Sequence, residues 1–333
     1  MSGRHRAPDA TDHAQHGDPI ADPVGWGNAP AVTSENGPIG ARNDGAQAGT
    51  TSRRPRAAKQ RVRSSDIDAL RIQLSERDIA ILLSVAEHHF MTTGQIEAIH
   101  FANHAPEVGA RLARRSLARL RRHRLLGCLE RRIGGVRAGS AGLVHHLDRT
   151  GYRLLADNAD RRARGFREPS TRFIDHRLAV AATHVTLIRA DQKRDIELAE
   201  CAIEPASWRR FTGTGGSRLA VKPDLYIETA TATDSDLVTA WFLEIDLGTE
   251  HIPTLLKKCR DYEAYRRSGI EQDRHGSFPL VIWSMAHHDP AKAHRRRQAL
   301  AEAIAADRNL SDVLFRIVAP EQLLPLIQQG ADR

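Results

Sequence analysis

The chain reads Lys222-Pro223-Asp224-Leu225-Tyr226-Ile227 and then, after a short interval, Trp241-Phe242-Leu243-Glu244-Ile245-Asp246-Leu247. Both stretches alternate apolar and polar residues, which predicts β-strands. Asp224 and Glu244 would then be carboxylates in hydrophobic strands, where an ionised group needs a compensating partner. A divalent cation is the obvious partner because hard cations take oxygen ligands. The alternative is that both acids lie on a solvated face of the sheet.

The pattern around these stretches predicts a unit with the order αβββαβ, followed by a further helix and strand. The helices are expected at 171–193, 252–267 and 290–306, and the strands at 196–203, 219–228, 240–247, 278–284 and 313–318. The strand at 278–284 is continuously apolar, which is typical of a strand buried on both faces. We therefore expect an α/β (α+β) domain over 171–325.

A separate unit is predicted over 72–158. Ser75 is an N-cap candidate, with Asp78 three residues later, and Pro106 suits the first turn of a later helix that runs to about 126. Another helix follows Thr92, strands are expected at 127–133 and 142–147, and a short helix at 149–157. Three helices followed by a hairpin predict a winged-helix domain.

The third helix of this unit carries its arginines on one side. Leu112, Leu117 and Leu120 share the other side of a 100° helical wheel. Such a helix is self-repelling unless phosphates neutralise it, which favours binding in the DNA major groove. The expected DNA contacts are Arg111, Arg114, Arg115, Arg121 and Arg122, with Arg137 on the loop between the strands. The alternatives are a solvated charged surface and a winged helix that docks a protein.

Composition supports a polyanionic partner. The formal net charge is +8, from 49 Lys+Arg against 41 Asp+Glu. No apolar run is long enough to span a bilayer and the N-terminus lacks a signal-peptide pattern, so we expect no membrane association and a cytoplasmic location. Residues 1–65 have few large apolar side chains, which predicts a disordered tail, and 159–170 is expected to be a basic linker.

The order of elements over 171–318, with Pro223-Asp224 at the second strand and Glu244-Ile245-Asp246 in the third, resembles the restriction-endonuclease-like PD-(D/E)xK fold. This resemblance implies that Asp224 and Glu244 coordinate Mg²⁺. Asp246 stands where that fold has lysine, and it could be an added ligand or a base. Lys258 on the next helix could supply the missing cation, whereas Lys257 points about 100° away.

The whole arrangement also resembles the replication-relaxation family of plasmids and integrative elements, because the winged-helix unit precedes Glu244-Ile245-Asp246-Leu247-Gly248-Thr249-Glu250 and the Lys258/Tyr262 pair. The family is similar to a class of mobilisation relaxases. Tyr262 lacks the histidine motif that accompanies a nucleophilic tyrosine, so we favour water activated by a metal ion and leave Tyr262 as an accessory residue.

Taken together, the sequence predicts a DNA-binding protein of a mobile element that nicks double-stranded DNA at an origin or transfer origin. Its catalytic residues would be Asp224, Glu244, Asp246 and Lys258, with other replication or conjugation proteins as further partners. One alternative is a non-enzymatic replication or transcription factor with a degenerate nuclease-like domain. Another is an adaptor that recruits a separate relaxase.

Overall fold

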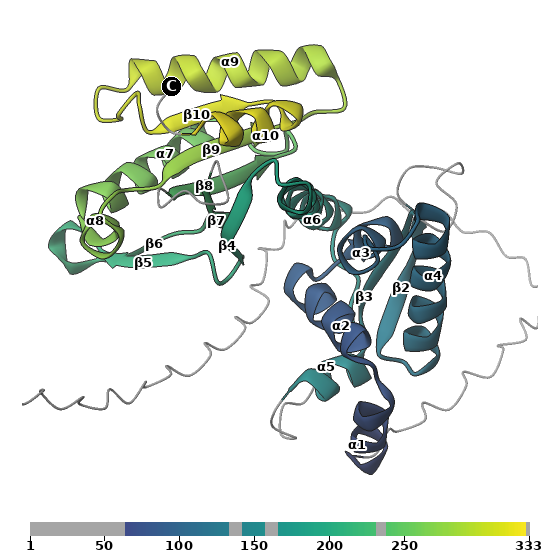
Figure 1. The fold of residues 1–333 in the computed structure, drawn as a ribbon. Coiled ribbons are helices and arrows are strands. Elements are labelled where there is room, and N and C mark those ends of the chain that lie inside the picture. Colours follow the sequence, from purple (N-terminus) through teal and green to yellow (C-terminus); the bar gives the residue numbers. More distant parts are fainter. Residues whose placement is uncertain (1–63, 133–141, 157–165, 231–237, 331–333) are drawn as a thin grey trace, which may run out of the picture. The chain divides into compact units, whose positions relative to one another are not determined.

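The computed structural model describes residues 64–132, 142–156, 166–230 and 238–330, all within the unit Lys59–Arg333. Helices and strands are interspersed along these ranges and build sheets of three, five and two strands (Figure 1). The protein is therefore mixed α/β, as predicted. None of the helices in the described ranges is long and apolar enough to cross a membrane.

The N-terminal elements form a three-stranded antiparallel sheet with helices packed against it. They are α1 (Ser64–Gln73), α2 (Glu76–His88), β1 (Met91–Thr92), α3 (Thr93–His100), α4 (Pro106–Arg122), β2 (Leu126–Arg132), β3 (Leu143–Leu147) and α5 (Arg149–Leu155). The strand order is β1-β3-β2. Apart from α1, these helices and the β2–β3 pair match the expected order.

Reciprocal caps start the first two expected helices. Ser75 Oγ accepts the N–H of Asp78 at 3.2 Å, and the Asp78 carboxylate accepts the N–H of Ser75 at 3.1 Å, which begins α2. Thr92 and Gln95 make the same exchange at the start of α3. Each capping box satisfies two backbone donors that a helix end leaves unpaired. These starts are therefore encoded by a few neighbouring residues.

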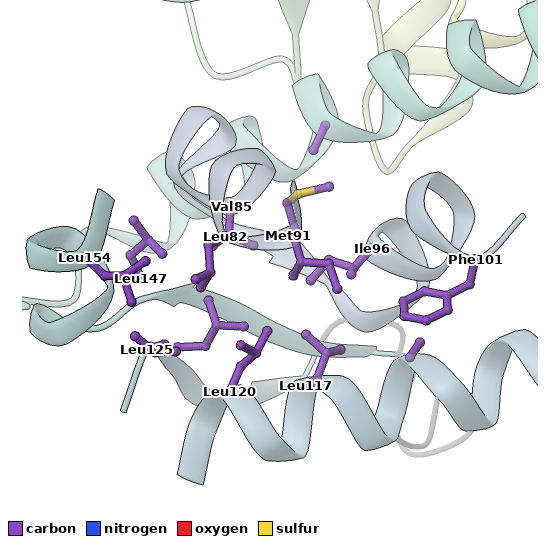
Figure 2. Packing of buried hydrophobic residues seen from close by; sticks show 14 of the residues in the cluster. Leu82, Val85, Met91, Ile96, Phe101, Leu117, Leu120, Leu125, Leu147 and Leu154 are labelled. Carbon is purple, nitrogen blue, oxygen red and sulfur yellow. The ribbon is translucent and has the colours of Figure 1, made fainter. Parts of the chain in front are cut away.

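One side of α4 belongs to the core of this region. Figure 2 shows Leu117 and Leu120 facing Leu82, Ile96 and Leu147, all of which are buried. Burial of such side chains is the dominant stabilising contribution to a core. Since the leucine side of α4 is used in packing, its opposite side faces away from the core.

The C-terminal elements form a five-stranded sheet covered by helices. They are α6 (Thr171–Gln192), β4 (Glu197–Ile203), β7 (Leu225–Ala230), β8 (Thr239–Asp246), α7 (Ile252–Arg267), α8 (Ile270–His275), β9 (Leu280–Met285), α9 (Pro290–Ala306), β10 (Phe315–Val318) and α10 (Pro320–Gln329). The strand order is β10-β9-β8-β7-β4. Strands β8, β9 and β10 run parallel, whereas β4, β7 and β8 pair antiparallel.

Two apolar clusters cover the two faces of this sheet. Leu243 packs in one cluster with Val180 of α6 and Leu323 of α10. Phe242, its neighbour in β8, packs in the other with Leu255 of α7. Successive side chains of a strand point to opposite faces, so β8 is apolar on both sides until it reaches Glu244.

The strand expected at 219–228 is two strands. β6 (Arg218–Val221) pairs with an unpredicted β5 (Arg209–Thr212) as a separate hairpin, and β7 begins only at Leu225. Pro223 explains the break, because proline has no N–H to donate to a sheet. Asp224 therefore precedes β7.

Other boundaries also differ from the prediction. Helix α4 ends at Arg122 instead of near 126, since Arg124 has a φ of 58°, which a right-handed helix does not contain. Helices α1, α8 and α10 were not predicted, and α10 continues past residue 325. Most of the predicted tail and the whole loop 134–141, with Arg137, lie outside the described residues. The predicted division into two domains stays a prediction.

Candidate functional site

Asp224 is held at the junction of three elements. Its N–H donates to the Leu243 carbonyl at 3.0 Å, and its Oδ2 accepts the Ile245 N–H at 2.7 Å. Its Oδ1 lies 2.8 Å from Nε2 of His176 on α6. The position of the carboxylate therefore depends on the backbone of β8 and on one side chain of α6.

Glu244 lies on β8 beside Asp224, because Leu225 of β7 pairs with Leu243 of β8. It is only 4% exposed. Its Oε1 accepts the Tyr262 hydroxyl at 2.7 Å, and its Oε2 lies 3.4 Å from Lys258 Nζ. Burial raises the pKa of Glu244 to about 7, with a further increase from the charge of Asp224, although Lys258 opposes the shift.

Lys258 bridges two acids from α7. Besides Glu244, its Nζ lies 3.2 Å from Oε1 of Glu250. Burial disfavours the charged ammonium, but attraction to Glu244 and Glu250 outweighs it and raises the pKa of Lys258. Lys257 is exposed and paired with Asp261 at 2.8 Å. As the helical wheel predicted, Lys258 and not Lys257 supplies the cation beside the acids.

Tyr262 and Asp246 both have partners within the protein. Tyr262 is 1% exposed, and burial followed by the charge of Glu244 raises the pKa of its hydroxyl well above the usual value. Asp246 Oδ2 pairs with Arg296 of α9 at 2.7 Å, and its Oδ1 accepts the Gly248 N–H at 3.0 Å. The acid at the expected lysine position is therefore paired with an arginine. Because no group of three or more His, Cys, Asp or Glu side chains in the described ranges is placed to hold a metal, Asp246 does not join Asp224 and Glu244 as a third ligand.

Three residues of this centre were not found from the sequence, namely His176, Glu250 and Arg296. His176 and Arg296 belong to α6 and α9 and have no motif around them. Burial lowers the pKa of His176, but the hydrogen bond and charge of Asp224 outweigh it, so the pKa is raised overall. Glu250 was part of the quoted acidic string, and its position eight residues before Lys258 was the one available signal.

The donor set fits a hard cation with two protein ligands. Asp224 and Glu244 occupy neighbouring backbone positions beside the Leu225–Leu243 pair and both supply carboxylate oxygens. Mg²⁺ is commonly held by one or two carboxylates together with water and substrate phosphate. Each of their four oxygens already accepts a hydrogen bond from the protein. Each carboxylate oxygen also has a second lone pair, which can coordinate a metal ion. Across the described ranges, no group of three or more His, Cys, Asp or Glu side chains is placed to hold a metal.

A second candidate surface is the outer side of α4, the arginine face, defined as Arg111, Arg114, Arg115, Arg121 and Arg122. Four of them are exposed and Arg121 is half-buried. The ion pairs in the described part of the chain involve none of these five. Arg119 instead pairs with the buried Asp78 at 2.7 Å, and Arg124 lies 3.8 Å from Asp148. The structure thus separates arginines that brace the fold from arginines that remain available.

These features define a mixed α/β protein with an arginine face on α4 and a buried carboxylate–lysine centre. A family model described as replication-relaxation matches residues 82–281, which include both features and more than half of the chain. The chain belongs to the replication-relaxation family. No curated protein and no solved structure matches it.

Proposed function

We propose that this chain is a DNA-binding protein of a mobile element that acts in plasmid replication, DNA relaxation or mobilisation. The family supports a role in replication or relaxation. The arginine face of α4 supports the DNA-binding part, and it is the observation that carries the proposal.

The geometry of α4 suits a recognition helix. Its leucines pack inward, so the arginine face can approach a duplex without disturbing the core. Helices α2, α3 and α4 followed by the β2–β3 pair have the order of a winged-helix domain, which inserts one helix into the major groove. Arginines placed there contact guanine edges or phosphates.

Binding of the full chain to a duplex from the element's own origin tests this proposal. Replacing Arg111, Arg115 and Arg122 by Ala should weaken binding by about 1–3 kcal/mol for each residue that contacts guanine, and by less for a phosphate contact. Arg119→Ala removes an arginine of the same helix that pairs with Asp78, so it should lower stability and leave DNA affinity unchanged. Unchanged affinity in the triple variant would remove α4 from the interface.

The second candidate function is metal-dependent nicking of the bound DNA, and the approach of Lys258 to Glu244 favours it. The sheet order and the paired acids resemble the restriction-endonuclease-like fold. Asp224 and Glu244 would hold Mg²⁺ or Mn²⁺, which when bound would supply Lewis-acid polarisation of the scissile phosphate. Double-stranded origin DNA would be the substrate.

The protein groups have distinct roles in this proposal. His176 and the Ile245 N–H orient Asp224, and the Tyr262 hydroxyl orients Glu244. Lys258 places a positive charge where negative charge would develop on the phosphate oxygens, which is an effective form of electrostatic catalysis. The alternative is a degenerate scaffold in which Lys258 only neutralises Glu244 and Glu250.

Supercoiled plasmid carrying the origin separates these two possibilities. The enzyme proposal expects open circles with wild type and Mg²⁺ or Mn²⁺, and none with Asp224→Ala. If wild type binds the origin but produces no open circles with either ion, the domain is a scaffold and the chain is a binding factor.

A further inference from the structure

The hairpin of β5 and β6 has a basic outer face that takes no part in the DNA contacts and chemistry proposed above. Arg210 and Arg218 are exposed on it, and the exposed Lys222 directly follows β6. The register pairs Arg210 with Ala220 and Thr212 with Arg218, so these four side chains leave the same face of the ribbon. The acidic residues of the described ranges make no ion pair with any of the three cations.

The inner face of the hairpin is anchored. Phe211 and Val221 are buried in the cluster that contains Leu255 of α7. Arg209 donates to the buried Glu271 at 2.8 Å and lies over the Tyr226 ring at 4.5 Å. The outer cations therefore stand on a ribbon held in a defined place.

The base of the hairpin joins the acidic centre directly. Lys222 Nζ lies 4.5 Å from the Trp208 ring centroid, which places the ammonium at the end of the ribbon. Ser207 Oγ donates to the Pro223 carbonyl and ties the two strands together there. Asp224 follows only two residues after Lys222, about 7 Å along an extended chain.

The three cations are spread along the ribbon, as suits contact with an extended polyanion such as duplex DNA. Diagonal neighbours across a strand pair are about 7–8 Å apart, which applies to Arg210 and Arg218. Arg218 and Lys222 are four residues apart, about 13 Å along the strand. A two-stranded ribbon is also narrow enough to lie against duplex DNA.

We propose that the outer face of the β5–β6 hairpin, formed by Arg210, Arg218 and Lys222, grips the phosphate backbone of duplex DNA and guides it to Asp224 and Glu244. This inference rests on the proposed DNA-binding function. It adds a second contact surface that is independent of the arginine face of α4.

The test compares two double variants of the full chain that lose the same charge. Arg210→Ala/Arg218→Ala removes two hairpin cations, and Arg295→Ala/Arg308→Ala removes two exposed cations on α9 and in the turn after it. Affinity for a duplex of arbitrary sequence is measured over a range of salt concentrations, because backbone contacts do not depend on sequence.

The hairpin variant should bind roughly tenfold more weakly, and the slope of log affinity against log salt should fall by about 2, one for each lost phosphate contact. The control should keep the wild-type slope, and both variants should keep the wild-type melting temperature. Equal slopes for wild type and hairpin variant overturn the inference. If wild type binds no DNA, the proposed function itself fails, which is a distinguishable result.

Discussion

Lys258 Nζ lies 3.4 Å from Glu244 Oε2 and 3.2 Å from Glu250 Oε1, so one ammonium on α7 pairs with two acids near the end of β8. Lys257, its neighbour, is exposed and pairs with Asp261. The two lysines have the same chemistry and differ in position, which makes them a matched pair for testing catalysis.

Lys258→Ala should lose nicking while it keeps DNA affinity. A preorganised charge near the transferred phosphate is worth about 3–4 kcal/mol, or roughly 10²–10³ in rate. Lys257→Ala should nick at nearly the wild-type rate. Open-circle formation from supercoiled origin plasmid measures both, and equal rates for wild type and Lys258→Ala would falsify the role of this lysine.

Mg²⁺ or Mn²⁺ should raise the melting temperature of the wild-type protein. A ligand that binds only the folded state stabilises it by about 2.7 kcal/mol at a hundredfold excess over its dissociation constant. Asp224→Ala and Glu244→Ala should each abolish the increase, whereas Asp246→Ala should retain it, because Asp246 is paired with Arg296. Calorimetry with and without the cation measures the melting temperature of wild type and of the three variants. An increase that persists in both Asp224→Ala and Glu244→Ala argues against the site.

In metal-free buffer, stability should fall as the pH rises between about 4.5 and 7. Glu244 loses its proton near 4.5 when unfolded but near 7 when folded, so the folded state binds more protons in this window. A shift of this size is worth on the order of 3 kcal/mol. The raised pKa of His176 acts in the same direction above 6.5, where its stabilisation is lost as the pH rises through the folded value.

Glu244→Gln isolates the glutamate, because it keeps His176. Urea unfolding at about pH 5 and about pH 7.5 should show a smaller loss of stability in the variant than in wild type. Equal losses would mean that Glu244 titrates near its ordinary value.

Asp78 should matter for stability and not for DNA contact. Its buried carboxylate caps α2 through Ser75 and pairs with Arg119 of α4. Ser75→Ala should lower the free energy of unfolding by about 1 kcal/mol, the usual cost of losing an N-cap. Asp78→Ala should cost more, since it also leaves Arg119 unpaired. Denaturant titration measures both, and an Asp78→Ala protein as stable as wild type would contradict the brace between α2 and α4.

Local signals accounted for much of what could be predicted. The capping boxes at Ser75 and Thr92 involve residues three positions apart, so the sequence displays them directly. Lys258 and Tyr262 are four apart on one helix, and the structure brings both to Glu244. Such contacts follow from helix periodicity. The break at Pro223 had an equally local cause and was missed, because apolar residues on both sides suggested one continuous strand.

The sequence by itself determined the types of most elements, the acidic pair Asp224 and Glu244, and the arginine face of α4, because each depends on residues close together in the chain. Only the tertiary structure decided which charges are neutralised. His176 reaches Asp224 across 48 positions, and Arg296 reaches Asp246 across 50. No sequence period specifies such pairs, since they form only when α6 and α9 pack on opposite faces of one sheet.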